Sequence, residues 1–208
     1  PMKTYVYVDA FNLYFGCCRG TPFKWLDISK LCQFKLPGHQ IEKIKYFTAR
    51  VHARPSDLTQ PVRQQVYLRA LKTIPTLEIY YGHFLTHVVK MPLAYPPPGT
   101  NPYVDIIKTE EKGSDVNLAT HLLHDGYNNR YECAVIVTGD SDLLAPVEIV
   151  MTELRKPVGV LNPQKQDCRV LLKQATFYKH IRKGVLAASQ FPPTLTDAQG
   201  TFTKPQSW

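Results

Sequence analysis

Two short apolar runs that each end in aspartate constrain this chain more than any other feature. The first run is Tyr5–Asn12 (YVYVDAFN) and the second is Val135–Asp142 (VIVTGDSD). Runs so rich in β-branched and aromatic residues are typical of fully buried strands in a parallel sheet. Ligands of open α/β sheets bind just beyond the carboxyl ends of the strands. We therefore expect Asp9, Asp140 and Asp142 to meet in one crevice.

Such a group of acids predicts a metal site, because carboxylates at close range repel one another unless a cation lies among them. Carboxylate oxygens are hard ligands that suit Mg²⁺ or Mn²⁺. Asn12 follows Asp9 by three residues, where it can orient a metal-bound water or contact phosphate, although a turn or capping role fits equally well. Thr138 and Ser141 flank the acids and are candidates for hydrogen bonds to substrate or to carboxylates. Capping of the next helix is the alternative role for the acids, and Asp142 is the better candidate for it.

A further acid, Asp115, belongs to the first turn of a helix predicted to begin at Ser114. At 100° per residue the helix has one apolar arc, formed by Val116, Leu118, Ala119, Leu122 and Leu123. Asp115 falls inside this arc, where a carboxylate needs a partner. The helix dipole explains its position along the helix but not the face that it occupies. We therefore add Asp115 to the candidate metal ligands.

The charge distribution favours a polyanionic substrate. The chain has 208 residues and a formal net charge of +8. Residues 105–153 carry ten acids and three Lys or Arg, whereas the flanking segments 39–90 and 155–183 carry eight Lys or Arg each. Carboxylates hold cations while basic flanks attract phosphate. An ordinary basic domain with uneven charge is the alternative.

Several function classes have no recognisable motif in this sequence. It has no HExxH, GxSxG or Walker-type GxxxxGK[ST] motif, so covalent catalysis and a nucleotide-binding loop have no visible residues. No apolar run approaches the roughly 20 residues that span a bilayer, and no secretory signal opens the chain. The five cysteines have no metal-ligand spacing. We expect reduced thiols and a cytoplasmic protein.

Alternating apolar patterns predict an α/β fold. Strands are expected at 4–8, 44–51, 76–81, 134–138, 158–161 and 177–181, and helices at 28–34, 61–74, 114–124, 143–154 and 166–174. This order predicts a mainly parallel central sheet with helices on both faces. A Pro-rich loop at 91–103, flanked by a possible hairpin of 84–89 with 104–107, lies within a domain over 3–183. Residues 184–208 are predicted to form an extended tail.

The two acid-tipped strands and the helix of Asp115 together resemble the NYN family, a branch of the PIN-like nuclease superfamily. The matching stretches are Val6–Asn12, Glu111–Leu123 and Val135–Val147. The resemblance implies a three-layer α/β/α PIN-like (Rossmann-like) fold with a mainly parallel central sheet. It implies a metal-dependent ribonuclease, an endonuclease with Mg²⁺ or Mn²⁺ as cofactor and RNA as partner. The implied catalytic and metal-binding residues are Asp9, Asp115, Asp140 and Asp142.

In such a nuclease, one or two metal ions bridge the carboxylates and the scissile phosphate. The candidates for phosphate contacts are Arg50, Arg54 and Lys112. Tyr14, Phe15 and Trp25 lie near the first motif and can stack on unpaired bases, although core packing is the favoured role for these aromatic residues. The Pro-rich loop is a candidate for shaping the groove.

One position departs from the family pattern. Where such helices often carry a further aspartate after Leu-Ala-x, this chain has His121. That residue and His124 fall on the polar arc of the helix, so we expect both to face solvent, and we do not interpret the change as inactivation.

Two other functions remain open on the residues alone. A non-catalytic RNA-binding or regulatory module can keep the acids for structure. A different phosphoryl hydrolase can use Asp-x-Asp chemistry, but that class usually places its paired acids on the first strand. Here the first strand offers Asp9 and Asn12, which argues against it.

Overall fold

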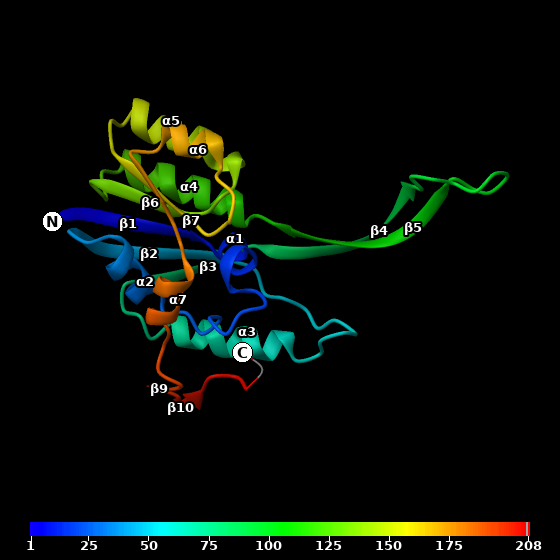
Figure 1. Cartoon of the computed structure of the whole chain (residues 1–208), viewed down its shortest axis with the longest axis horizontal. Coiled ribbons are helices and arrows are strands. Elements are labelled where there is room, and N and C mark those ends of the chain that lie inside the picture. Colours follow the sequence, from blue (N-terminus) through cyan, green and yellow to red (C-terminus); the bar gives the residue numbers. More distant parts are fainter. Residues whose placement is uncertain (207) are drawn as a thin grey trace.

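A six-stranded, all-parallel sheet lies between two layers of helices in the computed structural model, which describes residues 1–206 and 208 (Figure 1). The strands are β1 (Met2–Asp9), β2 (His39–Thr48), β3 (Leu77–Tyr81), β6 (Cys133–Val137), β7 (Val158–Asn162) and β8 (Phe177–His180). Their order is β3-β2-β1-β6-β7-β8. The chain therefore runs outward from β1 to β3 and then crosses back to β6. The β1/β6 pair is the switch point where such sheets bind ligands, and the predicted α/β/α fold is confirmed.

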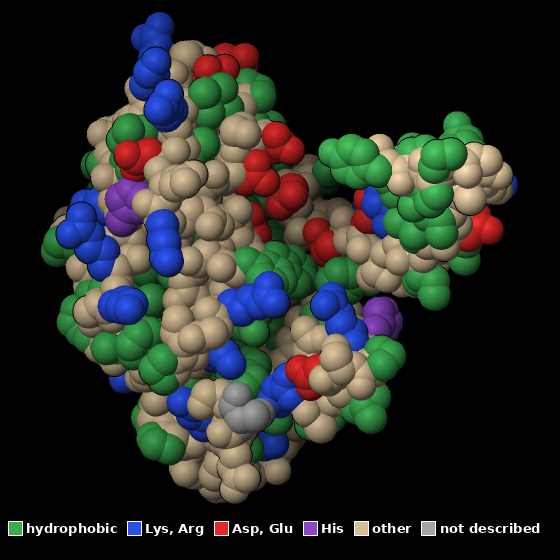
Figure 2. All heavy atoms as spheres, turned by 45° about the vertical axis from the view of Figure 1, so that its right-hand side comes forward, with side chains coloured by type: hydrophobic (Ala, Val, Ile, Leu, Met, Phe, Trp, Pro, Cys, Tyr) green, Lys and Arg blue, Asp and Glu red, His purple; other side chains and the backbone are tan. Residues whose placement is uncertain are grey.

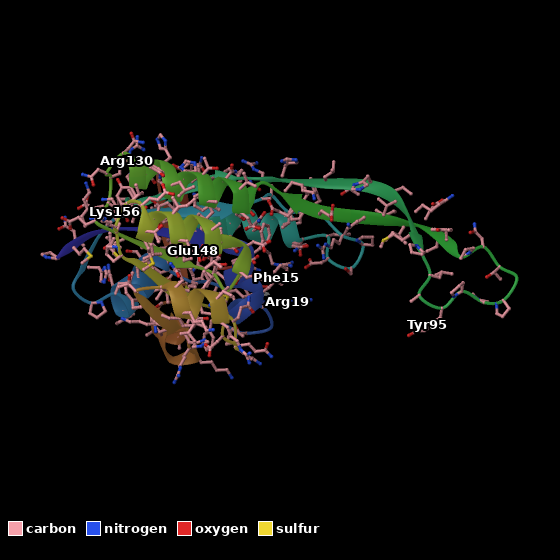
Figure 3. The ribbon with its side chains drawn as sticks, turned by 90° about the horizontal axis from the view of Figure 1, so that it is seen from above. Phe15, Arg19, Tyr95, Arg130, Glu148 and Lys156 are labelled. Atoms are coloured by element: carbon pink, nitrogen blue, oxygen red, sulfur yellow. The ribbon has the colours of Figure 1, made fainter. Side chains whose placement is uncertain are left out.

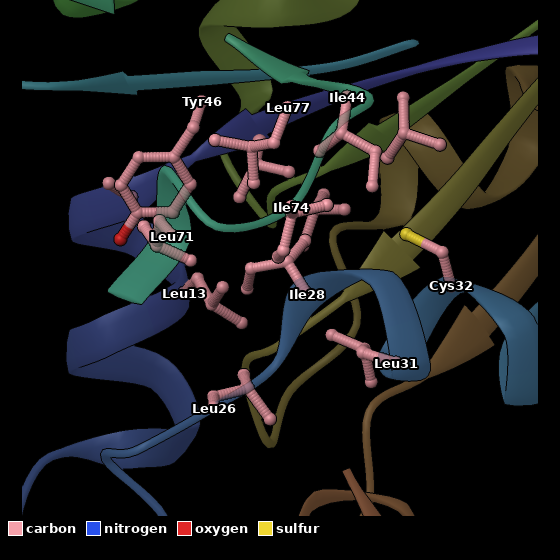
Figure 4. Packing of buried hydrophobic residues seen from close by; sticks show 14 of the residues in the cluster. Leu13, Leu26, Ile28, Leu31, Cys32, Ile44, Tyr46, Leu71, Ile74 and Leu77 are labelled. Carbon is pink, nitrogen blue, oxygen red and sulfur yellow. The ribbon is translucent and has the colours of Figure 1, made fainter. Parts of the chain in front are cut away.

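The sheet is buried on both faces. One face is covered by α2 (Ile28–Lys35), α3 (Gln60–Leu71) and α7 (Lys183–Ala188), and the other by α4 (Ser114–Tyr127), α5 (Leu144–Thr152) and α6 (Arg169–Gln174) (Figure 1). Successive residues of a strand point to opposite faces, so Val6 and Val8 join one core cluster while Tyr7 joins the other. Figure 4 shows the first cluster, in which Ile28 and Leu31 of α2 pack toward Ile44 of β2. Burial on both faces explains why these strands are continuous apolar runs.

A long hairpin arm interrupts the alternation between β3 and α4. It consists of β4 (His83–Pro92) paired antiparallel with β5 (Tyr103–Lys112), and it projects from the body of the protein (Figures 1 and 3). Gly113 joins the arm to α4 with a φ of 96°, a left-handed conformation that favours glycine. The hairpin is longer than predicted. The Pro-rich loop forms its distal tip, where Tyr95 lies far from Phe15 of the body (Figure 3), so the expectation that this loop shapes the groove was wrong.

The C-terminal segment has more structure than the predicted extended tail. It contains α7 and a small hairpin of β9 (Thr194–Asp197) and β10 (Gly200–Thr203). Asp197 pairs with Arg69 of α3 at 2.6 Å, and Phe202 is buried. Isolated buried residues such as Phe202 hold this segment against the body. Because they stand among prolines and polar residues, they leave no periodic apolar pattern in the sequence. Across the described ranges 1–206 and 208, no helix combines the length and apolarity that a bilayer crossing requires.

Candidate active site

Asp9 ends β1 at the switch point and is 4% exposed. It is the N-cap of the short helix α1 (Ala10–Leu13), where its Oδ1 accepts a hydrogen bond from the Asn12 backbone N–H at 2.9 Å. Its Oδ2 accepts a hydrogen bond from the Thr138 hydroxyl at 3.2 Å. Asp9 therefore has the turn role considered from the sequence and also lies beside the end of β6.

Thr138 connects the two acid-tipped strands. Its buried hydroxyl donates to Asp9 and accepts from the Asp140 backbone N–H at 3.1 Å. Of the two roles expected for Thr138, a hydrogen bond to a carboxylate is observed. A hydrogen bond to substrate is not open to it, because its side chain has no exposed surface. Asp140 is half-buried, and its Oδ1 accepts from the Asp142 backbone N–H at 3.0 Å. Asp140 rather than Asp142 therefore caps the next element, the 3-10 helix η2 (Ser141–Leu143), which corrects the sequence expectation.

Ser141 and Asp142 are both exposed at the start of η2. Neither belongs to the wall of the cavity that contains the other acids. Asp142 is nevertheless close enough to Asp115 to contribute to the raised pKa of that carboxyl. Asp142 therefore lies on the rim of the site, and the exposed Ser141 does not line the cavity.

Asp115 reaches the site from the first turn of α4. Its side chain is open to solvent, yet it lines the same cavity as Asp9 and Asp140. The buried side of α4 is formed by Leu118, Leu122 and Asp125, whereas Val116 is 69% exposed. The predicted arc was thus rotated by about one residue, which places Asp115 at its edge.

Glu111 is an acid of this site that the sequence reasoning missed. It lies near the end of β5 and lines the cavity. Its carboxylate accepts hydrogen bonds from the Ser114 backbone N–H at 3.1 Å and from the Ser114 hydroxyl at 2.7 Å. The signal was present, because an acid three residues before a predicted helix start is well placed to bond the free N–H groups there.

A cavity of about 480 Å³ opens beside these acids. Its acidic wall carries Asp9, Glu111, Asp115 and Asp140. The rest of the lining includes basic and aromatic side chains, namely Lys24, Arg54, Arg63, Tyr14, Phe15, Tyr67, Phe84 and Trp208. Asp57 also lines the cavity and forms an ion pair with Arg63. Figure 2 shows acidic side chains gathered where the arm joins the body, with hydrophobic and then Lys and Arg side chains below them. The cavity can therefore bind a cation beside the acids and an anionic or aromatic group along the rest of its lining.

Burial and mutual repulsion shift the pKa values of two of the acids. The pKa of Asp9 is raised from its ordinary 3.8 to about 7, mainly by burial and further by the charges of Asp115 and Asp140, against the hydrogen bonds from Asn12 and Thr138. The pKa of Asp115 is also raised, by partial desolvation where the side chain borders the cavity and by the charges of Asp140, Glu111 and Asp142. The direction is as expected from the sequence, but burial is the larger cause.

The donor set fits a hard divalent cation in its chemistry. Among the described residues, none of Asp9, Asp115 and Asp140 forms an ion pair with Lys, Arg or His. Oxygen ligands that repel one another and lack a protein counter-charge suit Mg²⁺ or Mn²⁺. Within residues 1–206 and 208, however, no three His, Cys, Asp or Glu side chains are already arranged to hold a metal. Binding would therefore require the carboxylates to turn toward the ion.

Asn12 acts within the protein. Its Oδ1 accepts hydrogen bonds from the Gly139 backbone N–H at 2.9 Å and from the Gln164 amide at 3.0 Å. It therefore ties the end of β1 to the loop after β6 and to the loop after β7. Gln164, which also lines the cavity, was not identified from the sequence, because its position after β7 carries no motif.

Of the three cations expected to contact phosphate, only Arg54 lines the cavity. Arg50 lies over the Tyr81 ring at 5.2 Å, outside the cavity wall. Lys112 is exposed and pairs with Glu110 at 3.2 Å. The structure instead adds two cations, Lys24 and Arg63.

The aromatic candidates divide into core and cavity residues. Trp25 is buried and donates its indole N–H to the Pro192 carbonyl at 2.8 Å, so it belongs to the core. Tyr14 and Phe15, in the π-helical segment η1 (Tyr14–Cys18), both line the cavity. These two remain available for stacking on a ring.

His121 does not face solvent, which corrects the sequence expectation. It is partly buried with its ring 4.1 Å from the Tyr80 ring, and its Nδ1 lies 3.2 Å from the Lys45 ammonium. Lys45 is itself paired at 2.6 Å with the fully buried Asp125. The pKa of His121 is lowered by burial and by Lys45. The side chain thus belongs to a polar network below α4, while His124 is exposed as expected.

The fold and the acids at its switch point define a Rossmann-like α/β protein with a carboxylate-lined ligand crevice. Residues 3–182 match the NYN domain family, and the chain belongs to this family. It is 32% identical to 6-hydroxy-3-succinoylpyridine 3-monooxygenase HspA of Pseudomonas putida over 238 aligned positions, covering 100% of this chain and 76% of the relative. A crystal structure of a protein of unknown function from Vibrio parahaemolyticus has the same fold, with a TM-score of 0.56 and 17% identity over 88% of this chain and 94% of that chain.

Proposed function

We propose that this chain is a metal-dependent ribonuclease that cleaves RNA internally. The observation that supports the proposal is the meeting of Asp9, Asp115 and Asp140 in one cavity, where none of the three is ion-paired with a Lys, Arg or His of the described residues. The three acids come from β1, α4 and the loop after β6, so only the fold brings them together. Family membership points in the same direction, because NYN domains are associated with nuclease-type chemistry.

The residues of the chain take separate roles in this proposal. Asp9, Asp115 and Asp140 would hold Mg²⁺ or Mn²⁺, which when bound activates water and neutralises phosphate charge. Thr138 fixes the carboxylate of Asp9 and the backbone at Asp140. Arg54, which also lines the cavity, contacts the phosphate backbone.

The cavity also suggests how unpaired RNA would be held. Tyr14 and Phe15 lie on its wall and offer ring faces to a base. Stacking of this kind tolerates any base, because every base has a π-face. Asn12 and Gln164 keep the loop beyond β6 in place beneath them.

The test is cleavage of mixed RNA by the purified protein with Mn²⁺ or Mg²⁺ and with EDTA. We expect activity only with metal, and at least a ~100-fold loss in Asp140→Asn, since a ligand and a charge are removed while the shape is kept. Glu148→Gln is the matched control, because Glu148 is an exposed acid of α5 away from the cavity (Figure 3). Equal cleavage by the wild type and Asp140→Asn would refute the proposal. Binding without cleavage would favour a non-catalytic RNA-binding module.

A second candidate function is binding of a small heteroaromatic acid. The relative at 32% identity is named for 6-hydroxy-3-succinoylpyridine, and a cavity of about 480 Å³ is within the range of single-ligand sites. Its wall combines rings such as Tyr67 with the cations Arg54 and Arg63. Calorimetric titration with 6-hydroxy-3-succinoylpyridine tests this candidate. Binding that Arg54→Gln weakens would favour it, and no binding together with metal-dependent RNA cleavage would exclude it.

A further inference from the structure

The hairpin arm (β4, β5 and the loop between them) exposes many large apolar side chains to solvent. Nine of them lie along its length and tip, namely Leu85, Val88, Met91, Leu93, Tyr95, Tyr103, Val104, Ile106 and Ile107. Tyr95 is 94% exposed and Ile107 is 78% exposed. Contiguous apolar surface of this kind marks an interaction site in a soluble protein.

Both faces of the arm are apolar, so a single contact with the body would not cover it. The register places Val88 opposite Ile107 on one face. It places Val89 opposite Ile106, and Met91 opposite Val104, on the other face. An isolated two-stranded hairpin is marginally stable in water, whereas three or more strands with a buried face are stable. Near its base the arm contacts the body, where Phe84 packs against Phe11 and His52. Within the described residues, both edges of the two-stranded ribbon are unpaired, and most of its apolar side chains beyond the base are exposed.

The charge of the arm argues against RNA as that partner. Residues 83–112 carry three lysines, Lys90, Lys108 and Lys112, and three acids, Asp105, Glu110 and Glu111. The arm is thus neutral within a chain of net charge +8. A nucleic-acid surface needs an excess of positive charge, whereas a neutral apolar ribbon can approach a second neutral ribbon without repulsion.

We propose that the arm is a dimerisation arm whose partner is the arm of a second copy of this chain. Two identical ribbons related by a two-fold axis can pair antiparallel at their free edges, which turns two strands into a four-stranded sheet. Such pairing satisfies the backbone groups at one edge of each ribbon and shields the apolar side chains that border that edge. Two-fold dimers are the commonest closed assemblies of soluble proteins.

The size of the arm is sufficient for such a contact. The nine exposed side chains present on the order of 1,000 Å², compared with the roughly 800 Å² that each partner contributes to a standard interface. A strand of ten residues extends about 33 Å. That length carries the tip well clear of the body, where a second arm can reach it (Figure 1).

The test is the mass of the full chain in solution, measured by light scattering and sedimentation over micromolar to submillimolar concentrations. We expect the wild type to have twice the 23.7 kDa of one chain. The double variant Val88→Asp/Ile107→Asp places two acids opposite each other on the ribbon, and should raise the dimer dissociation constant by roughly 100-fold or more. Val62→Asp is the control, because Val62 is 61% exposed on α3, away from the arm.

Hydrogen exchange of the wild type keeps the proposal testable even if the double variant does not fold. Amides at the outer edge of one strand of the ribbon, either β4 or β5, should gain protection as the concentration rises, while those of the β9–β10 hairpin should not change. A monomeric wild type across the whole range would overturn the proposal. So would a dimer that forms only when RNA is added, or one that Val62→Asp disrupts as strongly as the arm variant.

Discussion

Replacing Asp9 by asparagine should make the metal-free protein more stable at high pH. Asp9 is buried, and its pKa rises from 3.8 to about 7 on folding. Below pH 4 the carboxyl is protonated in both the folded and the unfolded state. Between pH 4 and 7 only the folded state keeps the proton, so the free energy of unfolding falls as the pH rises. Above pH 7 the carboxyl is ionised in both states, so the free energy of unfolding falls no further.

The size of this loss follows from the two pKa values. At 1.36 kcal/mol per pH unit, a rise from 3.8 to about 7 corresponds to about 4 kcal/mol. The asparagine amide does not titrate, and its oxygen can still accept the hydrogen bond from the Asn12 backbone N–H. The difference in stability between Asp9→Asn and the wild type should therefore shift by about 4 kcal/mol in favour of the variant from pH 4 to pH 8.

Urea unfolding in EDTA, monitored by the fluorescence of the buried Trp25, measures this difference. Adding Mn²⁺ at pH 8 should then stabilise the wild type by about 3 kcal/mol at 100 times its dissociation constant, and leave Asp9→Asn unchanged. A stability difference that is the same at pH 4 and pH 8 would refute the reasoning, because Asp9 would then ionise in the folded protein without cost.

Three other substitutions test the packing that positions the site. Thr138→Val leaves the Asp9 carboxylate without a hydrogen-bond donor and the Asp140 backbone N–H without an acceptor; it should cost about 1–3 kcal/mol, as measured by urea unfolding, while Thr138→Ser should restore most of it. Gly139→Ala would place a methyl group 2.5 Å from the Asn162 Oδ1, so we expect a loss of about 1–3 kcal/mol in the same assay; a thermal midpoint equal to that of the wild type would contradict the fit. Lys45→Met removes the ammonium partner of the buried Asp125 carboxylate, which keeps Arg130 at 3.1 Å, and should cost about 1–3 kcal/mol at pH 7 in the same assay.

The central fold was predictable because buried parallel strands carry a strong local signal. The runs at β1 and β6 are apolar throughout and end abruptly in acid, so their adjacency at the switch point followed from general sheet topology. The arm was recognised only in part, because its outer pairs lie next to prolines that interrupt the strand pattern. The C-terminal hairpin was missed, since Phe202 is buried without any neighbouring periodicity.

The sequence predicted those site residues that can be recognised from their residue type and their position in a strand or helix. Asp9 and Asp140 were identified because each is an acid at or just after the end of a buried strand, and both line the cavity. Lys24 and Arg63 were missed because their approach depends on how the connections after β1 and β2 pack, which no local pattern encodes. His121 was misplaced because an ideal helical wheel does not include the contact with Tyr80 that the neighbouring strand supplies.

The most direct measurement of the central claim is Mn²⁺ binding to the metal-free protein, detected by electron paramagnetic resonance at pH 7.5. We predict saturable binding by the wild type and by Glu148→Gln, and at least a ~10-fold weaker affinity in Asp140→Asn and in Asp115→Asn. Binding that is equally tight in all four proteins, or no binding by the wild type, would contradict the account.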